Sequence, residues 1–461
     1  MQGTRRLHDG RSSSHSFLAV LVGLVASMFL PAGPAHPAGG DLLWQDQFDL
    51  AGGQDVAKAV ASSNGRVVVV GSAQNGAGNS VFVVRAYDPE HGTLLWEDRV
   101  DPEGGNGQAT AVVMDNQRVV VLGQGVDAMG NSRTLIRAYV AETGELAWAD
   151  HWPAPQFGQG GLALQGGHVV TAGLGVDASG NRRVLVRAYA KKSGALAWED
   201  EWAPPVGGEW IGTAKTVAIE HGQAFVAATY YPIPGLGSSL CLVRSHEVAS
   251  GTLLWQSTTS IGTGQCVANA VATDGKAVVI AEKGGGAAPD DFQAEAFDAA
   301  TGELLWRRDP RGRTGLADAA VAVDTEHRVA FVTGYEFKSF APPPPTFRGV
   351  LVVRAYDTET GILRWEDQFP VPPEASCECL GLDGVAVKGR MYVVGRRSTG
   401  NWLVRAYDSH SGDLLWQDEV AVVTGSFSMA VAADRGRVFV AGAALNAAGN
   451  LDFILRTYDA K

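Results

Sequence analysis

Cysteine is scarce in this chain, and the common signatures of catalysis are absent. Only four of the 461 residues are cysteine, so a dense framework of disulfides does not hold the fold together. No HExxH, GxSxG or P-loop pattern occurs, which argues against zinc-protease, serine-hydrolase and phosphate-loop chemistry. We therefore assign no catalytic residue and no metal ligand from a known motif.

Positive charge and long apolar runs are also in short supply. The formal net charge is -12 at pH 7, without a basic stripe, which argues against nucleic acid as a partner. The apolar run Phe17–Leu30 is 14 residues long, too short to span a bilayer comfortably. It follows three arginines and precedes small residues and prolines, as in a secretory signal. We expect a signal peptide over residues 1–38, and a periplasmic or secreted, monomeric domain over 39–461 without a transmembrane segment.

What the chain does contain is a repeated segment that ends in tryptophan. Its copies are AYDPEHGTLLW (Ala86–Trp96), AYVAETGELAW (Ala138–Trp148), AYAKKSGALAW (Ala188–Trp198), SHEVASGTLLW (Ser245–Trp255), AFDAATGELLW (Ala296–Trp306), AYDTETGILRW (Ala355–Trp365) and AYDSHSGDLLW (Ala406–Trp416). LLW at Leu42–Trp44 and TYD at Thr457–Asp459 supply the two halves of an eighth copy. The eight tryptophans, Trp44, Trp96, Trp148, Trp198, Trp255, Trp306, Trp365 and Trp416, recur every 50 to 59 residues. This period matches one blade of a propeller.

Each repeat unit is patterned as four short strands. In the first unit, VAKAVAS, RVVVVGS, SVFVVRAY and TLLWEDRV are β-branched or aromatic runs separated by turn residues. If the terminal strand Phe453–Tyr458 pairs with Leu42–Phe48, the two ends share one sheet and close a ring. The predicted fold is all-β, an eight-bladed β-propeller of four-stranded blades.

The fixed residues of the repeat have structural interpretations. A glycine in each complete copy suits a hairpin turn that requires positive φ, and we interpret all eight tryptophans as packing between blades. Arginine precedes the Ala-Tyr pair or its equivalent in seven units, and Glu295 is the exception. An aspartate follows many of the tryptophans by two residues, so we expect ion pairs between adjacent third and fourth strands.

The first strand of each unit provides the candidate site. Alignment of these strands places Lys58, Thr110, Gly161, Lys215, Asn269, Ala319, Asp383 and Met429 in one irregular column. Lys58 and Lys215 are candidates for an anionic ligand, and Asn269 and Asp383 for a hard cation. Trp210 precedes such a strand and could stack on a planar ligand. The alternative is that these are solvated strand ends and a loop tryptophan without a ligand.

Two hairpins and two cysteine pairs depart from the repeat. The segments Thr229–Ser239 and Glu336–Gly349 lengthen their hairpins, and the second carries four prolines, as in a partner-binding lip or a tolerated surface insertion. Cys241 and Cys266 fit either a disulfide or two buried thiols. Cys377 and Cys379 form a weak signal for a strained bridge or a metal.

The pattern A-x-D-x-x-T-G-x-x-x-W resembles the tryptophan-docking repeat of the pyrroloquinoline-quinone-type propellers, over essentially all of residues 39–461. That superfamily includes quinoprotein alcohol dehydrogenases, and also a non-enzymatic propeller lipoprotein of the bacterial outer-membrane assembly machinery. The dehydrogenase branch is associated with adjacent cysteines and with calcium or a lanthanide beside a catalytic aspartate. This chain has no Cys-Cys pair, and it lacks the lipid-anchor cysteine of the other branch.

We expect an exported, non-enzymatic scaffold that binds a protein or small-molecule ligand at the loop-rich mouth of the propeller, without a cofactor. The alternative is a dehydrogenase of alcohols or sugars that uses pyrroloquinoline quinone with calcium. In that case Asp383 would be the catalytic base.

Overall fold

The structure is a computed structural model of the whole chain. It describes residues 39–102, 104–154, 160–177, 179–202, 214, 216–230, 239–259, 265–285, 291–308, 318–340, 346–369, 379–397, 400–420 and 427–461. In these residues no helix has the length and apolar character needed to cross a membrane.

The described strands form eight antiparallel sheets of four strands each, which we call blades I to VIII. Blade I contains β1 (Leu42–Phe48), β30 (Phe427–Asp434), β31 (Arg437–Leu445) and β32 (Leu451–Asp459). Blades II and III contain β2 (Val56–Ser63), β3 (Arg66–Gln74), β4 (Ser80–Tyr87), β5 (Leu94–Val100), β6 (Asn106–Met114), β7 (Arg118–Val126), β8 (Ser132–Val140) and β9 (Leu146–Pro153). Blades IV and V contain β10 (Gly161–Gln165), β11 (His168–Val176), β12 (Arg182–Ala190), β13 (Leu196–Trp202), β14 (Thr216–Glu220), β15 (Gln223–Tyr230), β16 (Leu240–Glu247) and β17 (Leu253–Thr259). Blades VI and VII contain β18 (Gln265–Thr273), β19 (Ala277–Gly285), β20 (Asp291–Asp298), β21 (Leu304–Arg308), β22 (Ala319–Glu326), β23 (Val329–Phe340), β24 (Thr346–Asp357) and β25 (Leu363–Phe369). Blade VIII contains β26 (Cys379–Val387), β27 (Arg390–Arg397), β28 (Trp402–Asp408) and β29 (Leu414–Val420).

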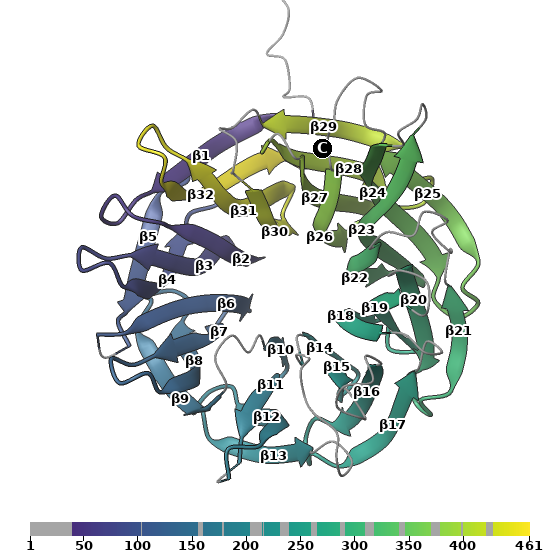
Figure 1. Cartoon of the computed structure of the whole chain (residues 1–461), viewed down its shortest axis with the longest axis horizontal. Coiled ribbons are helices and arrows are strands. Elements are labelled where there is room, and N and C mark those ends of the chain that lie inside the picture. Colours follow the sequence, from purple (N-terminus) through teal and green to yellow (C-terminus); the bar gives the residue numbers. More distant parts are fainter. Residues whose placement is uncertain are drawn as a thin grey trace, which may run out of the picture. The chain divides into compact units, whose positions relative to one another are not determined.

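The predicted eight-bladed propeller is confirmed, including the way in which it closes. The blades follow one another around a ring, with one strand of each at the centre and one at the rim (Figure 1). In blade I, β1 pairs with β32 from Leu42↔Tyr458 to Phe48↔Phe453. The Gly40 amide donates to the Asp459 carbonyl (2.9 Å), so the two ends of the domain together rebuild the turn that is continuous in other blades.

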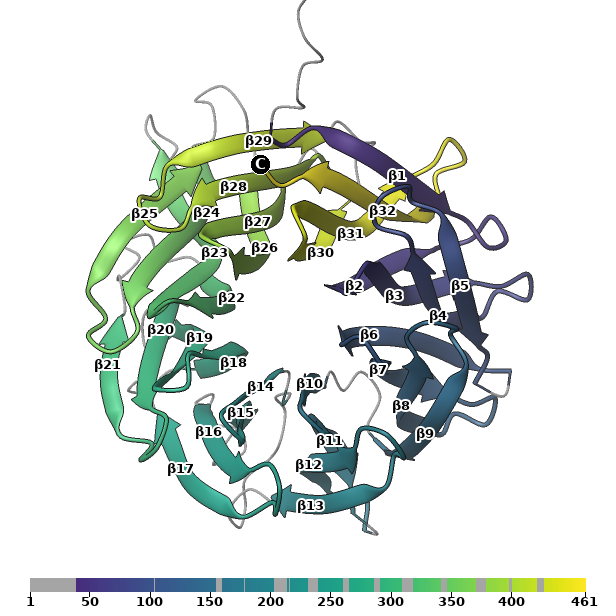
Figure 2. The same ribbon diagram turned by 180° about the vertical axis from the view of Figure 1, so that it is seen from behind.

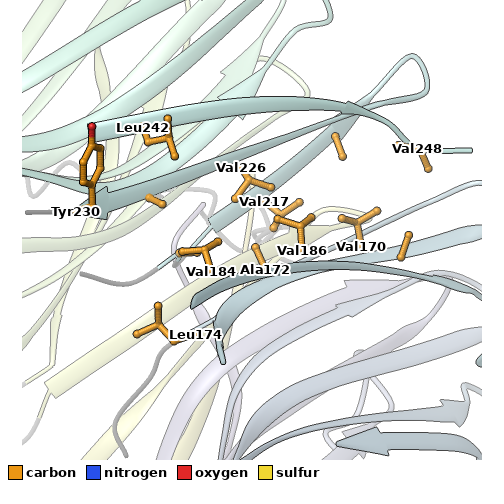
Figure 3. Close-up of a cluster of buried hydrophobic side chains, with 14 residues drawn as sticks. Val170, Ala172, Leu174, Val184, Val186, Val217, Val226, Tyr230, Leu242 and Val248 are labelled. Atoms are coloured by element: carbon orange, nitrogen blue, oxygen red, sulfur yellow. The ribbon is translucent and has the colours of Figure 1, made fainter. Parts of the chain in front are cut away.

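The core is divided among the interfaces between neighbouring blades. Each of the eight buried apolar clusters joins two adjacent blades. Between blades IV and V, for example, Val170 and Val186 on one sheet face Val217 and Val226 on the next (Figure 3). This division explains why a repeat of 50 to 59 residues is stable only as part of the ring, because a single blade cannot bury both of its faces.

The docking tryptophans make the same contact at every interface. Each indole lies against a glycine of the next blade whose φ is positive, between 64° and 87°. These pairs are Trp44–Gly92, Trp96–Gly144, Trp148–Gly194, Trp198–Gly251, Trp255–Gly302, Trp306–Gly361, Trp365–Gly412 and Trp416–Gly40. In seven of them the indole Nε1 also donates to a backbone carbonyl of the next blade, for example from Trp148 to Lys191 (2.9 Å). The interpretation of the tryptophans as structural agrees with this arrangement.

The expected ion pairs form, but their geometry differs from the prediction. In six blades the arginine of the third strand reaches the aspartate of the preceding blade, as in Arg405–Asp367 (3.1 Å) and Arg137–Asp98 (3.3 Å). Arg354 of blade VII pairs instead with Glu336 and Glu366 of its own blade. Within its own blade, an arginine such as Arg85 pairs with a glutamate, Glu97 (3.0 Å). The aspartates therefore tie blades to each other, because their side chains leave the sheet on the face that meets the next blade.

Replacement of a docking glycine tests this contact. A Cβ on Gly144 would lie 2.5 Å from Cδ2 of Trp96, and φ there is 74°. We expect Gly144→Ala to lower the free energy of unfolding by about 2 to 4 kcal/mol, since backbone strain adds to overpacking. Urea unfolding measures the change. Gly130→Ala is the matched control, because φ is 87° but no atom lies within 4 Å of the added Cβ. An equal loss in both variants would contradict the docking explanation.

Candidate functional site

The first strands of the blades, β2, β6, β10, β14, β18, β22, β26 and β30, surround the centre of the ring (Figure 2). In six of them the pairing with the second strand is interrupted by one extra residue: Lys58, Thr110, Asn269, Val321, Leu382 and Met429. This bulge corrects the alignment made from the sequence. Ala319 and Asp383 do not occupy the column of Lys58, and Gly161 pairs with Ala172 in ordinary register.

Two of the predicted ligand residues bond to the neighbouring blade. Lys58 Nζ donates to Gln108 Oε1 of blade III, and burial lowers the pKa of Lys58. The Asn269 amide donates to the Ala320 carbonyl of blade VII (2.8 Å). Both side chains thus have a role in linking blades, independent of any ligand.

Asp383 is held in a similar way. Its Oδ2 accepts the Val431 amide of blade I (2.9 Å), and its Oδ1 accepts the Gly384 amide (2.9 Å). Asp324 of blade VII accepts the Ala386 amide of blade VIII (2.8 Å) and the Thr325 amide (2.8 Å). Burial raises the pKa of each aspartate to about 6, and backbone hydrogen bonds oppose that rise.

The predicted ligand residues do not converge on one point. Lys58, Asn269 and Asp383 stand on blades II, VI and VIII, no two of which are neighbours. Trp210 and Lys215 lie outside the described residues. The ligand-binding assignments of all five therefore stay predictions.

The positions of Asp383 and Asn269 also test whether these residues could hold calcium together with pyrroloquinoline quinone. A bound calcium ion requires several free oxygen ligands at one place. Both Asp383 oxygens already accept backbone amides, and the Asn269 amide group lies in another part of the ring. Within the described residues, Asp383 and Asn269 therefore do not form a site for calcium and pyrroloquinoline quinone. We derive no reaction step through either group.

A buried polar cluster that the sequence did not reveal lies between blades V and VI. We name it the Glu282 cluster: Thr259, Glu282, Gln293 and Glu295, each no more than 4% exposed. Burial and the nearby Glu295 raise the pKa of Glu282 well above its usual value, and burial also raises that of Glu295. Of these residues, the sequence analysis singled out only Glu295, which stands where the other seven units have an arginine. Alignment of the second strands by register would have identified Glu282 as well.

The cysteines beside this cluster are joined. Cys241 of β16 and Cys266 of β18 form a disulfide that links blades V and VI, which decides between the two possibilities left open by the sequence. Cys377 lies outside the described residues. A Glu282 carboxylate oxygen and the two sulfur atoms lie within 4.8 Å of one another.

A cavity of about 210 Å³ opens at the boundary of blades II and III. Its lining includes Asp101, Asp127, Arg133, Arg137 and His151. Arg133 pairs with Asp127 at 3.1 Å. This cavity belongs to strands β5, β7, β8 and β9, so it is separate from the first strands at the centre of the ring.

The outer strands expose a regular series of apolar side chains, which we call the leucine belt. It comprises Leu42, Leu43, Leu94, Leu95, Leu146, Leu196, Leu253, Leu254, Leu304, Leu305, Ile362, Leu363, Leu414 and Leu415, which are 39% to 64% exposed. The cause is a register shift that recurs where each outer strand begins, as between Ala86/Tyr87 opposite Leu94 and Trp96. Adjacent apolar residues therefore both remain exposed in most blades.

Comparison with known proteins identifies relatives of the fold. The model of the family described as outer membrane protein assembly factor BamB matches residues 35–177, 80–290 and 239–449. The dehydrogenase subunit of the quinone alcohol dehydrogenase of Gluconacetobacter polyoxogenes is 32% identical over 130 residues, which are 27% of this chain and 16% of that protein. The match thus spans about a sixth of that relative's length.

Two solved structures share the architecture. The quinohemoprotein alcohol dehydrogenase ADHIIG of Pseudomonas putida HK5 has a TM-score of 0.56 and 14% identity, over 91% of this chain and 76% of that one. The quinohemoprotein alcohol dehydrogenase of Comamonas testosteroni has a TM-score of 0.56 and 13% identity, with the same coverage of 91% and 76%. These similarities establish the fold alone.

The raised pKa of Asp383 predicts a pH dependence of stability. Its value of about 6 exceeds the 3.8 of an unperturbed aspartate, so the folded chain holds the proton more tightly and stability falls as pH rises toward and through 6. Between pH 5 and pH 7.5 the free energy of unfolding should therefore fall by about 1 kcal/mol less in Asp383→Asn than in the unchanged protein. Urea unfolding measures this difference.

The control for this measurement is Asp88→Asn. The amide of His91 lowers the pKa of Asp88, so this exposed carboxylate is ionised in both states over that pH range. The pH dependence should therefore match that of the unchanged protein. If Asp383→Asn kept the pH dependence of the unchanged protein, Asp383 would not be the group responsible for it.

Proposed function

Because this chain belongs to the family described as outer membrane protein assembly factor BamB, the PQQ-like propeller repeat proteins, we propose that it is a non-enzymatic scaffold that binds a partner protein. We further propose that it is exported to the periplasm or beyond. The family description names an assembly factor, which is consistent with a protein partner. The Cys241–Cys266 disulfide supports an oxidising compartment.

The observation that carries the proposal is the leucine belt. Isolated exposed leucines are ordinary on a protein surface, but apolar side chains repeated at the same place on successive blades offer many equivalent contacts. The outer strands are also sheet edges, whose free backbone groups can pair with an added strand. The first strands also favour a scaffold over an enzyme, because their polar residues Lys58, Asn269 and Asp383 form hydrogen bonds to neighbouring blades. We propose the belt, with the loop-rich mouth as a further contact, as the surface for the partner.

One observation favours a second function, a quinone-dependent dehydrogenase of alcohols or sugars. It is the match of 130 residues to the quinone alcohol dehydrogenase subunit. Asp383 would be its base, since a pKa of about 6 suits a group that accepts a proton near neutral pH. Each of its oxygens already accepts a backbone amide, and these hydrogen bonds favour the ionised carboxylate over the protonated form that a base must reach. This makes the dehydrogenase the weaker proposal.

Site-specific crosslinking tests the scaffold. With the photoreactive residue p-benzoylphenylalanine at Leu95 or Leu415, we expect one discrete crosslinked protein in the cells that naturally make this chain. The same residue at Met129, which is 84% exposed but lies on a hairpin outside the belt, should give no such product. Identical products from Met129, or none from the belt, would count against this surface.

A titration with pyrroloquinoline quinone separates the two functions. With calcium present throughout, we expect tryptophan fluorescence and the melting temperature to stay constant up to about 100 μM quinone. We also expect no reduction of an artificial electron acceptor by alcohols or sugars. Saturable quinone binding followed by acceptor reduction would establish the dehydrogenase in place of the scaffold.

A further inference from the structure

The Glu282 cluster includes two strand positions that are apolar in the other seven blades. Glu282 pairs across strands with Gln293, and Glu295 pairs with Arg307. In the other blades the position of Glu282 holds a residue without a polar side chain: Gly71, Gly123, Gly173, Ala228, Gly334, Gly395 and Gly442. The position of Gln293 is also apolar in every other blade: Val83, Leu135, Leu185, Leu242, Val352, Leu403 and Ile454. At these two positions, polar side chains therefore occur in blade VI alone.

The usual ion pair is missing from the same interface. The other third strands carry an arginine where blade VI has Glu295, and blade V offers Ser257 where most blades have an aspartate. Ser257 bonds to the Gly302 carbonyl (2.5 Å) instead. Arg307 donates to Glu295 Oε1, as does Gln293 Nε2 (2.8 Å). The cluster thus holds two carboxyl groups but one guanidinium.

Several oxygens of the cluster lack a hydrogen-bond partner although they are buried. Apart from what the Thr259 hydroxyl donates, they are Glu282 Oε1 and Oε2, Gln293 Oε1 and Glu295 Oε2. The Thr259 hydroxyl lowers the pKa of both carboxyl groups by hydrogen bonding, but its single proton can serve only one of them at a time. Buried polar atoms without partners are uncommon and costly, so their presence in one place indicates that something binds them.

We propose that the Glu282 cluster binds one hard cation, with calcium as the best fit, between blades V and VI. All the unpartnered atoms are oxygens, and carboxylate, amide and hydroxyl oxygens are the ligands of such ions. A soft metal fits less well, because the nearby sulfurs of Cys241 and Cys266 are joined to each other and offer no thiolate. The bound ion supplies the positive charge that arginine provides at other interfaces.

This site is independent of the proposed scaffold function and of any quinone. Its ligands come from β17, β19 and β20, so they converge only when blades V and VI are docked. The cation therefore stabilises one interface of the ring, beside the disulfide that joins the same two blades.

Calorimetric titration of the EDTA-dialysed, non-reduced protein with calcium chloride tests the site. We expect one calcium ion per chain and a rise of about 3 °C in melting temperature at a calcium concentration 100 times Kd. No heat of binding and no shift would overturn the proposal and leave a site filled by water. Zinc binding that appears only after a dithiol reduces the disulfide, without calcium binding, would also overturn it.

Two variants locate the ion, and both introduce residues that sister blades already carry at the same position. Glu282→Ala corresponds to Ala228, and Gln293→Leu corresponds to Leu135. Glu282→Ala should abolish the calcium response, and Gln293→Leu should weaken calcium binding at least about tenfold, while both remain folded without calcium. Asp324→Asn, at a different interface, should leave the calcium response unchanged. Calcium binding of normal affinity in both cluster variants would refute the proposed ligands.

Discussion

The ring depends on the contact between a tryptophan of one blade and a glycine turn of the next. The indole lies where any Cβ would stand, and the turn has a positive φ, so two separate constraints select glycine at the same position. In seven interfaces the indole N–H also bonds to the turn backbone, so position and orientation are fixed together. Trp416 meets Gly40 in the same way, although Gly40 lies at the opposite end of the chain.

The sequence was sufficient to predict this architecture because the docking contact is encoded in adjacent residues. Tryptophan, glycine and turn polar groups recur within eleven residues, so one alignment of the chain with itself gives the number of blades. The split copy at Leu42–Trp44 and Thr457–Asp459 predicted the closure, because two half-repeats can only complete one sheet. The short strands between turn residues also excluded a fold built from helices.

The site was less predictable because its geometry depends on residues that are far apart in sequence. The strands of Lys58 and Asp383 bulge at the same place, and the bulged residues are Lys58 and Leu382, so Asp383 lies one position beyond the column. Nothing in the local sequence marks the bulged residue. Aspartates such as Asp367 pair with the next blade because of the face on which they leave the sheet. Glu282 looks ordinary within its own strand, and it becomes an exception only when paired strands of all blades are compared.

The pairing of β1 with β32 determines how the ring responds to mechanical force. Leu42 and Tyr458 lie opposite each other at one end of the ladder, and Phe48 and Phe453 lie at the other end. Tension that pulls the segment before Leu42 away from Lys461 therefore loads the hydrogen bonds one after another, as in unzipping, instead of shearing all of them together. The molecule has one seam with low mechanical resistance, and opening it would detach β1 while the continuous blades keep all four of their strands.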